Sequence, residues 1–304
     1  MSRPDPSNVR LVACVGAGTI GAGWAAYFLA RGMDVIATDS DAEGEAKLRR
    51  FVDLAWPKLT QLGLAEGASP GRLRYASTVA ETVAEADFIQ ESAPDWEDLK
   101  IGLFEEIGAA ARDDVVIASS SSKFLPSRIS LNCAHPERCI VGHPFAPSYL
   151  MPLVEVVGGE RTDDEVMDWA MAFYDGIGKV ALRLKREIES YIANRLQHVV
   201  FDEMHRLVDA GVCDYKDVDT AMRFGPGLRW AFAGPLTCLH MAGGQGGLKG
   251  FIDHFGWSGP EALEAEAVGE IDKLYGDLTM DQIEAWRDGN LLAMLGSLKT
   301  DPKG

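Results

Sequence analysis

Two kinds of hydrophobic pattern alternate along the first part of the chain. Short runs rich in β-branched residues, such as 9–15 and 34–38, have the length and composition of buried strands. Between them lie longer stretches with helical spacing, and Pro57 within 41–62 predicts a kink or a break in one of these helices. This alternation is typical of a parallel sheet with helices on both faces. The predicted strands are 9–15, 34–38, 88–90, 115–119, 139–142, 153–157 and 180–184, and the clearest helices are 19–31, 41–62 and 97–111.

After residue 187 the pattern changes to helical spacing alone. Glycine-rich sequences at 225–230 (GPGLRW) and 242–247 (AGGQGG) are predicted to be connections. The chain is therefore predicted to fold as an α/β domain over residues 1–187 and an all-α domain over residues 188–304. The helices predicted in the second domain are 189–212, 214–224, 260–275 and 279–299.

The net charge restricts the classes of partner. With 46 acidic and 29 basic residues, the chain has a formal net charge of −17. It would repel the phosphates of a nucleic acid, so we expect no nucleic-acid partner. A small or zwitterionic substrate fits this charge, whereas a CoA ester would need a local basic patch.

Residues 11–30 contain no charged side chain, as a signal peptide or a membrane span would. Four glycines weaken that interpretation, and the motif they form explains the segment better, so we expect no membrane association. The cysteines are odd in number and show no CxxC spacing, so we expect reduced thiols in the cytoplasm, without a disulfide framework or a metal site. They are Cys14, Cys133, Cys139, Cys213 and Cys238.

A glycine motif, GAGTIG at 16–21, follows the first predicted strand and opens the first predicted helix. In that context the first glycine permits a tight turn, and the second lets a pyrophosphate approach the backbone. The third lets the helix pack closely against the sheet. The phosphates would then lie at the helix N-terminus, where free N–H groups and the helix dipole favour anions.

Asp39 ends the second predicted strand, 18 residues after the last glycine of the motif. A carboxylate at this position can bind ribose hydroxyls and would repel a 2′-phosphate, so NAD is the predicted cofactor rather than NADP. Together the motif and the acid predict a Rossmann-type, doubly wound, mainly parallel sheet. The predicted nucleotide-binding residues are Gly16, Gly18, Thr19, Ile20, Gly21 and Asp39.

Several short sequences resemble the 3-hydroxyacyl-CoA dehydrogenase family. The resemblance extends from the glycine motif into the helical half, and its sequences are specific in combination. It implies an NAD-dependent dehydrogenase acting on the 3-hydroxyl of an L-3-hydroxy acid, with a helical domain that binds substrate and forms a homodimer. The matching sequences are ESA (91–93), EDLK (97–100), SSSS (119–122), GHPF (142–145), LVEV (153–156) and NRL (194–196).

His143 is the best candidate for the base that such an oxidation needs. An imidazole can hold or release a proton near neutral pH, and the position between a strand and Pro144 predicts an extended loop at the ligand-binding edge of the sheet. Glu155 ends another strand 12 residues later and can fix the tautomer of the imidazole. An acid in the otherwise apolar LVEV also needs a partner.

The resemblance implies four further site residues. Ser122 would hydrogen-bond the reacting oxygen, and Asn194 would complete the catalytic set from the helical domain. Glu97 and Lys100 would lie near the nicotinamide. Taken singly, each of these side chains has an ordinary structural alternative, such as a helix cap or a helix surface position.

Two longer sequences, 143–162 and 225–236, are similar to the carnitine 3-dehydrogenases of this family and, less closely, to L-gulonate 3-dehydrogenases. AGGQGG favours the former. The chain departs from the acyl-CoA enzymes at Lys123, where they have a small residue, and at Ala146, where they have asparagine. The predicted reaction is therefore the oxidation of L-carnitine to 3-dehydrocarnitine.

A trimethylammonium group has no hydrogen-bond donor, so its recognition requires aromatic faces. For most of the available aromatic residues, ordinary core packing is the alternative. The substrate carboxylate needs a cation, and the sequence does not choose between Lys123 and Arg229. The candidate aromatic residues are Phe145, Tyr149, Trp230, Phe232 and Trp257.

Other functions stay open at this point. L-gulonate, another short L-3-hydroxy acid and an L-3-hydroxyacyl-CoA are alternative substrates. A non-enzymatic NAD-binding structural protein is the alternative from another class, and it predicts loss of the catalytic set. The chain keeps all four members of that set, His143, Glu155, Ser122 and Asn194.

Overall fold

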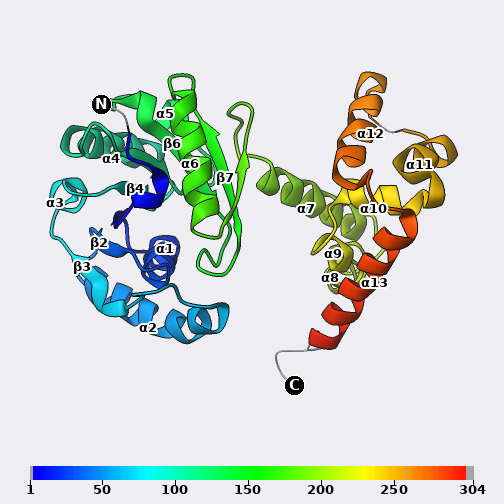
Figure 1. Ribbon diagram of the computed structural model, residues 1–304, viewed down its shortest axis with the longest axis horizontal. Helices are drawn as coiled ribbons and strands as arrows, with labels where there is room; N and C mark the ends of the chain where they lie inside the picture. The colour runs from blue at the N-terminus through cyan, green and yellow to red at the C-terminus, as the bar shows by residue number, and fades with distance from the viewer. Residues whose placement is uncertain (1–2, 258, 299–304) are drawn as a thin grey trace. The chain divides into compact units, whose positions relative to one another are not determined.

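The computed structural model describes residues 3–257 and 259–298 (Figure 1). The chain forms two compact units, Met1–His198 and Val199–Gly304, and the division between them falls inside the helix α7 (Ala193–Asp209). Each unit has buried hydrophobic clusters of its own.

Eight strands of the first unit form one sheet, in the order β3-β2-β1-β4-β5-β6-β7-β8. β7 runs antiparallel to β6, and all other neighbouring strands are parallel. The strand order reverses between β1 and β4, which is where ligands bind at the carboxyl edge of such sheets. The strands are β1 (Leu11–Val15), β2 (Asp34–Thr38), β3 (Leu73–Tyr75), β4 (Phe88–Glu91), β5 (Val116–Ser119), β6 (Cys139–Pro144), β7 (Leu153–Gly158) and β8 (Val180–Arg183).

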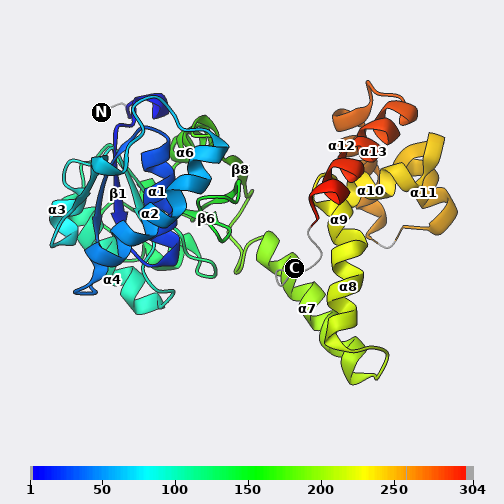
Figure 2. The same ribbon diagram turned by 90° about the horizontal axis from the view of Figure 1, so that it is seen from below.

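Helices cover both faces of this sheet because its strand residues are apolar on both sides. In β1, Val12 and Cys14 join a cluster with α1, α2 and α6, whereas Ala13 and Val15 join a cluster with α3, α4 and α5. α1 and α2 lie together beside β1 (Figure 2). The helices of this unit are α1 (Thr19–Ala30), α2 (Gly44–Leu62), α3 (Val79–Val83), α4 (Glu97–Ala110), α5 (Pro126–Ile129) and α6 (Asp164–Gly176).

The predicted doubly wound, mainly parallel sheet is confirmed, and the predicted strands lie close to the observed ones. Pro57 does not break α2, which continues through it to Leu62. β3 and α6 were not predicted. β3 has only three residues, which is too short for a periodic pattern to be recognised.

The second unit is helical throughout its described part. Its two hydrophobic clusters are small, and α8 (Tyr215–Phe224) contains no buried residue. The predicted connection at 225–230 is wrong, because residues Pro226–Trp230 form the helix α9, with the proline in its first turn where the missing N–H is not needed. The remaining helices are α10 (Pro235–Ala242), α11 (Gly247–Phe255), α12 (Glu261–Tyr275) and α13 (Met280–Ser297).

Residues 244–246 of the second glycine-rich sequence form a single 3-10 turn before α11, in agreement with a connection. The predicted end of the last helix at residue 299 lies outside the described residues. Within the described part of the chain, no helix combines the length and the apolar character needed to cross a membrane.

Candidate active site

The glycine motif forms the turn between β1 and α1. Gly16 has a φ of +93°, and a Cβ there would lie 2.7 Å from the backbone nitrogen of Ala93. A Cβ on Gly21 would collide with the carbonyl oxygen of Gly16, whereas Gly18 faces open space. No side chain caps the start of α1, so its first N–H groups remain available to a ligand. The three glycines thus provide the tight turn, the open approach and the close packing that the motif predicts.

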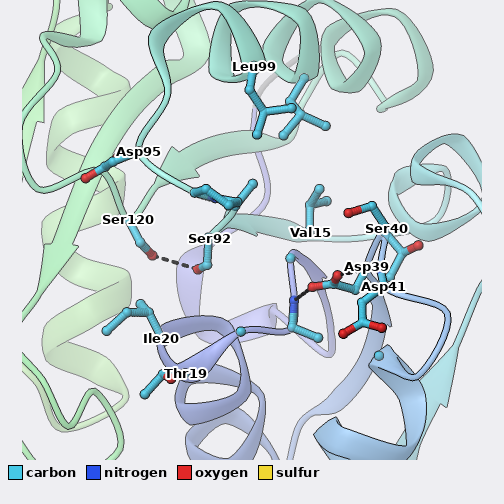
Figure 3. Close-up of a pocket in the computed structure, with 18 of the residues that line it drawn as sticks. Val15, Thr19, Ile20, Asp39, Ser40, Asp41, Ser92, Asp95, Leu99 and Ser120 are labelled. Carbon is cyan, nitrogen blue, oxygen red and sulfur yellow. Dashed lines mark hydrogen bonds between the residues drawn. The ribbon is translucent and has the colours of Figure 1, made fainter.

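Asp39 follows β2 and lies beside this turn (Figure 3). Its Oδ2 accepts a hydrogen bond from the backbone N–H of Ala17 at 2.5 Å, and its Oδ1 accepts one from that of Asp41 at 2.9 Å. The carboxylate therefore orders the turn and also lines the cleft described next.

A cleft of about 1180 Å³ follows the carboxyl edge of the sheet. The ends of β1, β2, β4, β5 and β6 all contribute to its lining, so the cleft lies at the edge where ligands bind in open α/β sheets. Of the predicted site residues, it brings together Gly16, Gly18, Thr19, Ile20, Asp39, Ser122, His143, Phe145 and Asn194.

His143 and Glu155 face each other across the antiparallel pair β6 and β7, where the strand register makes them direct partners. Nδ1 of His143 lies 2.9 Å from Oε2 of Glu155. The imidazole is 5% exposed and the carboxylate is fully buried. His143 belongs to the end of β6, which is longer than predicted, and not to a loop that follows the strand. The strand pairing therefore fixes the orientation of the imidazole.

Three hydrogen bonds act on the Glu155 carboxylate. Burial alone would raise the pKa of Glu155, but the bonds from His143 and from the backbone N–H groups of Ala193 and Ile192 hold that pKa below its ordinary value. The carboxylate is therefore ionised at neutral pH and can only accept hydrogen bonds. Nδ1 of His143 must then carry the shared hydrogen, which leaves Nε2 as the nitrogen that can accept a proton.

Ser122 lines the same cleft but is held by a residue that the sequence analysis did not identify. Its hydroxyl and its backbone N–H both donate to Oδ2 of Asp95, at 2.8 and 2.9 Å. Burial tends to raise the pKa of Asp95, but the hydrogen bonds from Ser122 and the charge of Lys100 keep that pKa below its ordinary value. Asp95 is thus an ionised member of the cleft.

Asn194 is the second residue of α7 and lies in the first unit, not in the helical unit from which the sequence analysis predicted it. Its Nδ2 donates to the carbonyl oxygen of Ser122 at 3.1 Å, and its Oδ1 accepts from Gln197 at 3.2 Å. The amide is therefore attached to the serine loop, in agreement with the predicted proximity of Ser122 and Asn194.

Glu97 and Lys100 do not line the cleft. Lys100 is buried and its ammonium group donates to both carboxylate oxygens of Glu91, at 2.9 and 3.0 Å, and to the carbonyl of Ala93. Glu97 pairs with Arg128 at 2.7 Å. Lys100 acts on the cleft only indirectly, because it fastens the segment 92–95 that forms part of the lining.

The residues predicted to bind the substrate lie in different environments. Phe145 lines the cleft and its ring centroid is 5.3 Å from that of His143. Lys123 is exposed beside the ring of Phe124, outside the cleft lining. Tyr149 packs against Phe51. The other candidates belong to the second unit. Arg229 and Trp230 are exposed. Phe232 packs against Trp286, and the indole N–H of Trp257 donates to the carbonyl of Pro260. Their role in binding stays a prediction.

Sequence reasoning missed several polar side chains of the cleft, among them Ser92, Asp95 and Ser120. Ser92 and Ser120 directly follow β4 and β5 and lie within sequences that the family resemblance had already marked, and Asp95 lies four residues after the end of β4. Their position after buried strands was the signal that could have identified them, because such positions lie at the ligand-binding edge.

The nucleotide site fits NAD on the basis of its backbone alone. A side chain at Gly16 or Gly21 would fill the space that the turn requires, and the uncapped N–H groups of α1 match a pyrophosphate. Residues 3–257 and 259–298 contain no group of three or more His, Cys, Asp or Glu side chains arranged to hold a metal ion.

Comparisons with known proteins agree with this geometry. Residues 11–188 match the family model described as 3-hydroxyacyl-CoA dehydrogenase, NAD binding domain, and residues 191–273 match the C-terminal domain of the same family. The chain is 46% identical to an L-carnitine dehydrogenase of Nocardiopsis dassonvillei, over 98% of this chain and 94% of that protein. It is 47% identical to an L-carnitine dehydrogenase of Streptomyces coelicolor, over 96% of this chain and 92% of that protein.

A crystal structure of 5-formyl-3-hydroxy-2-methylpyridine 4-carboxylic acid 5-dehydrogenase, described as an NAD⁺-dependent dismutase, has the same fold. Its TM-score is 0.75 at 24% sequence identity, and the match covers 95% of this chain and 97% of that chain. The glycine turn and the cleft beside it thus belong to a dehydrogenase that uses NAD, and the chain is a member of the 3-hydroxyacyl-CoA dehydrogenase family.

Proposed function

We propose that this dehydrogenase oxidises the 3-hydroxyl of L-carnitine, giving 3-dehydrocarnitine and NADH. The observation that carries the proposal is the 2.9 Å contact between His143 and Glu155 in a cleft that also contains the glycine turn. A base and a nucleotide site in one cleft are what the oxidation of an alcohol by NAD requires.

The cofactor and four side chains of the chain each have a role in this oxidation. NAD, when bound, supplies the hydride acceptor. Nε2 of His143 takes the hydroxyl proton, and ionised Glu155 stabilises the imidazolium that results. Ser122 and Asn194 are proposed to hold the reacting oxygen, which requires the Ser122 hydroxyl to turn from Asp95 toward the substrate.

The choice of L-carnitine is supported by the relatives that bear the name L-carnitine dehydrogenase at 46% and 47% identity. The ring of Phe145 beside His143 adds a local reason. An aromatic face close to the base can attract the trimethylammonium group, which is only two bonds from the reacting carbon. A CoA ester would bring several phosphates toward ionised Asp95 and a chain of net charge −17.

A substrate panel tests the proposal. NADH formation is measured at alkaline pH with L-carnitine, D-carnitine, L-gulonate and L-3-hydroxybutyryl-CoA, since the oxidation releases a proton. We expect the highest kcat/KM with L-carnitine and very little turnover with its enantiomer. A higher kcat/KM with L-gulonate or the CoA ester would replace L-carnitine as the substrate, and no turnover with any of them would contradict the proposed reaction.

We propose further that residues 188–304 form a substrate-binding and dimerisation domain, and that the chain works as a homodimer in the cytoplasm. α7 and α8 contain no buried residue, although apolar side chains such as Leu196, Val199 and Phe224 lie on them. A second copy of the chain could cover these side chains. All five cysteines are free thiols, which agrees with a reducing compartment.

A further inference from the structure

A chain of hydrogen bonds leads from the core of the first unit to the cleft. Oγ of Ser120 accepts one hydrogen bond from the indole Nε1 of Trp24 at 3.2 Å and another from Nε2 of Gln90 at 2.9 Å. The same oxygen lies 2.8 Å from Oγ of Ser92, and both serines line the cleft (Figure 3). Trp24 and Gln90 are fully buried.

The orientation of the Gln90 amide follows from its other partners. Its nitrogen lies 3.4 Å from the carbonyl oxygen of Gly142, which can only accept a hydrogen bond. Its Oε1 accepts from the hydroxyl of Tyr174 at 2.7 Å. Burial raises the pKa of Tyr174 well above its ordinary value, so this hydroxyl keeps its proton. The nitrogen of Gln90 therefore faces Ser120 as a donor.

These donors determine the direction of the bond between the two serines. A hydroxyl oxygen has two acceptor positions and one hydrogen. On Ser120 the indole N–H and the amide N–H occupy both acceptor positions, so its hydrogen must go to Ser92. Ser92 then accepts from Ser120. Within the described residues, no hydrogen bond gives the hydroxyl hydrogen of Ser92 an acceptor. A donor without a partner is thus present at the wall of the cleft.

Ser92 lies directly against the glycine turn. A Cβ on Gly16 would be 2.8 Å from the carbonyl carbon of Ser92, and a Cβ on Gly21 would be 3.2 Å from its Cβ. The free hydroxyl hydrogen therefore lies beside the uncapped N-terminus of α1, where the oxygens of a pyrophosphate accept hydrogen bonds. Acceptors are the only groups that a pyrophosphate offers, so the chemistry of the donor and of the ligand match.

We propose that Ser92 is a cofactor-binding residue whose hydroxyl, aligned by Ser120, Gln90 and Trp24, donates a hydrogen bond to the ribose–pyrophosphate part of NAD. The inference concerns the nucleotide site alone and does not depend on which 3-hydroxy acid is oxidised. It adds to the glycine turn a side-chain donor that the sequence motif does not contain.

Isothermal titration calorimetry of the full-length protein with NADH and with ADP-ribose tests this role. We expect Ser92→Ala to weaken the binding of both ligands by about 10-fold, the effect typical of a lost hydrogen bond to a charged acceptor. ADP-ribose lacks the nicotinamide, so equal losses assign the contact to the shared part of the two ligands. A loss with NADH alone would overturn the proposal, because it would move the contact to the nicotinamide.

Two further variants separate this role from a general loss of stability. Ser120→Ala leaves Ser92 in place but removes its alignment, so we expect a smaller loss of affinity than for Ser92→Ala. Ser130→Ala removes a buried serine of the same unit that bonds to the carbonyl of Pro126, outside the cleft lining, and should leave both affinities unchanged. Thermal unfolding of each variant shows whether it folds.

Unchanged affinities in a folded Ser92→Ala protein would overturn the proposal. Should the wild-type protein bind neither ligand, both the assignment of NAD as cofactor and the proposed role of Ser92 would be overturned. If Ser92→Ala does not fold, Ser92→Cys keeps the size of the side chain with a much weaker donor, and an affinity equal to the wild type would overturn the proposal in the same way.

Discussion

The first unit and the helices α7 and α8 differ in how far their side chains are buried. In the sheet unit even charged groups are buried, and each has partners, as Lys100 has in Glu91 and Glu155 has in His143. α7 and α8 have no buried residue at all. Their apolar side chains are 48% to 67% exposed, at Leu196, Val199, Phe201, Tyr215 and Phe224.

This difference indicates which part of the molecule is complete by itself. Among the described residues of the sheet unit, the buried side-chain polar atoms have hydrogen-bond partners except for Nε of Arg31, Arg72 and Arg138. The unit also forms the whole of the cleft described here from its own residues. The two helices expose apolar surface, and covering that surface would lower the free energy of the protein in water. Chemistry should therefore respond most to changes in the sheet unit, and assembly should respond most to changes in the helices.

The largest effect is expected at the base. His143→Gln should lower kcat by about 10³-fold, because general base catalysis typically contributes 10²- to 10⁴-fold. The affinity for NADH, measured by calorimetry, should change little, since the glycine turn is untouched. His135→Gln is the matched control, because His135 is half-buried beside Glu137 and outside the cleft lining. Equal losses of kcat in both variants would remove His143 from its proposed role.

Glu155→Gln should come next. An amide keeps the size of the side chain but cannot stabilise the imidazolium, so we expect kcat to fall by about 10²-fold. The steady-state rate with saturating L-carnitine and NAD⁺ measures this loss. A variant with the wild-type rate would show that the carboxylate is only structural.

The same residue gives a pH dependence of stability. The pKa of Glu155 is lower in the folded protein than in the unfolded chain, so its contribution is fully present above the unfolded value of about 4.3. That contribution is lost as the pH falls through the lowered folded value. Urea unfolding of the wild type and of Glu155→Gln should therefore differ most near neutral pH and converge in acid. A difference that grows in acid would contradict the sign.

The helical surface should respond to a charge. Val199→Glu places a carboxylate on α7, at a side chain that is 67% exposed, and should weaken a homodimer by about 10-fold or more through the cost of burying it. Sedimentation velocity at several protein concentrations measures the change. Leu54→Glu on α2 is the control, since Leu54 is 62% exposed in the sheet unit. Identical sedimentation of the wild type and both variants would exclude this surface of α7 as the interface.

Lys179, a buried lysine of the sheet unit, gives a second pH dependence of stability. It donates to the carbonyls of Ser148 and Met151, and lies 3.8 Å from the ring centroid of Tyr27. Burial, together with the charge of Arg31, lowers the pKa of Lys179 to about 7.

Between that pH and the ordinary lysine value of about 10.4, the unfolded chain binds a proton that the folded protein has released. Stability should therefore rise with pH across this window in the wild type, relative to Lys179→Met. Chemical unfolding of both proteins at several pH values measures the slope. A slope of the opposite sign, or the same slope in both proteins, would contradict this account of Lys179.

Much of the sheet unit could be predicted from the sequence because its strands are apolar on both faces and its glycine motif has a defined geometry. A contact between His143 and Glu155 was also predicted, but for a different reason. Glu155 lies inside β7 and not at its end, and the antiparallel pairing of β7 with β6 places it opposite His143. β3 was missed because three residues carry no pattern, and α9 because Pro226 and the glycines around it are typical of a connection as well as of a helix start.

The cleft was harder to predict than the sheet. Glu97 is held by Arg128, 31 residues away, and Lys100 by Glu91 and Asp95 across the turn after β4, and the folded structure shows these pairings. Asp95 was missed because its partner, the loop serine Ser122, comes from the next strand. Local patterns describe elements well, but they do not contain the contacts between elements that decide which polar side chains remain free.

The most direct test of the account is a crystal structure of the protein with NADH and L-carnitine. The account predicts that the pyrophosphate lies over the turn at Gly16–Gly21 and that the substrate hydroxyl is within hydrogen-bond distance of Nε2 of His143. A structure in which the nicotinamide or the hydroxyl lies away from His143, with the contact to Glu155 intact, would contradict it.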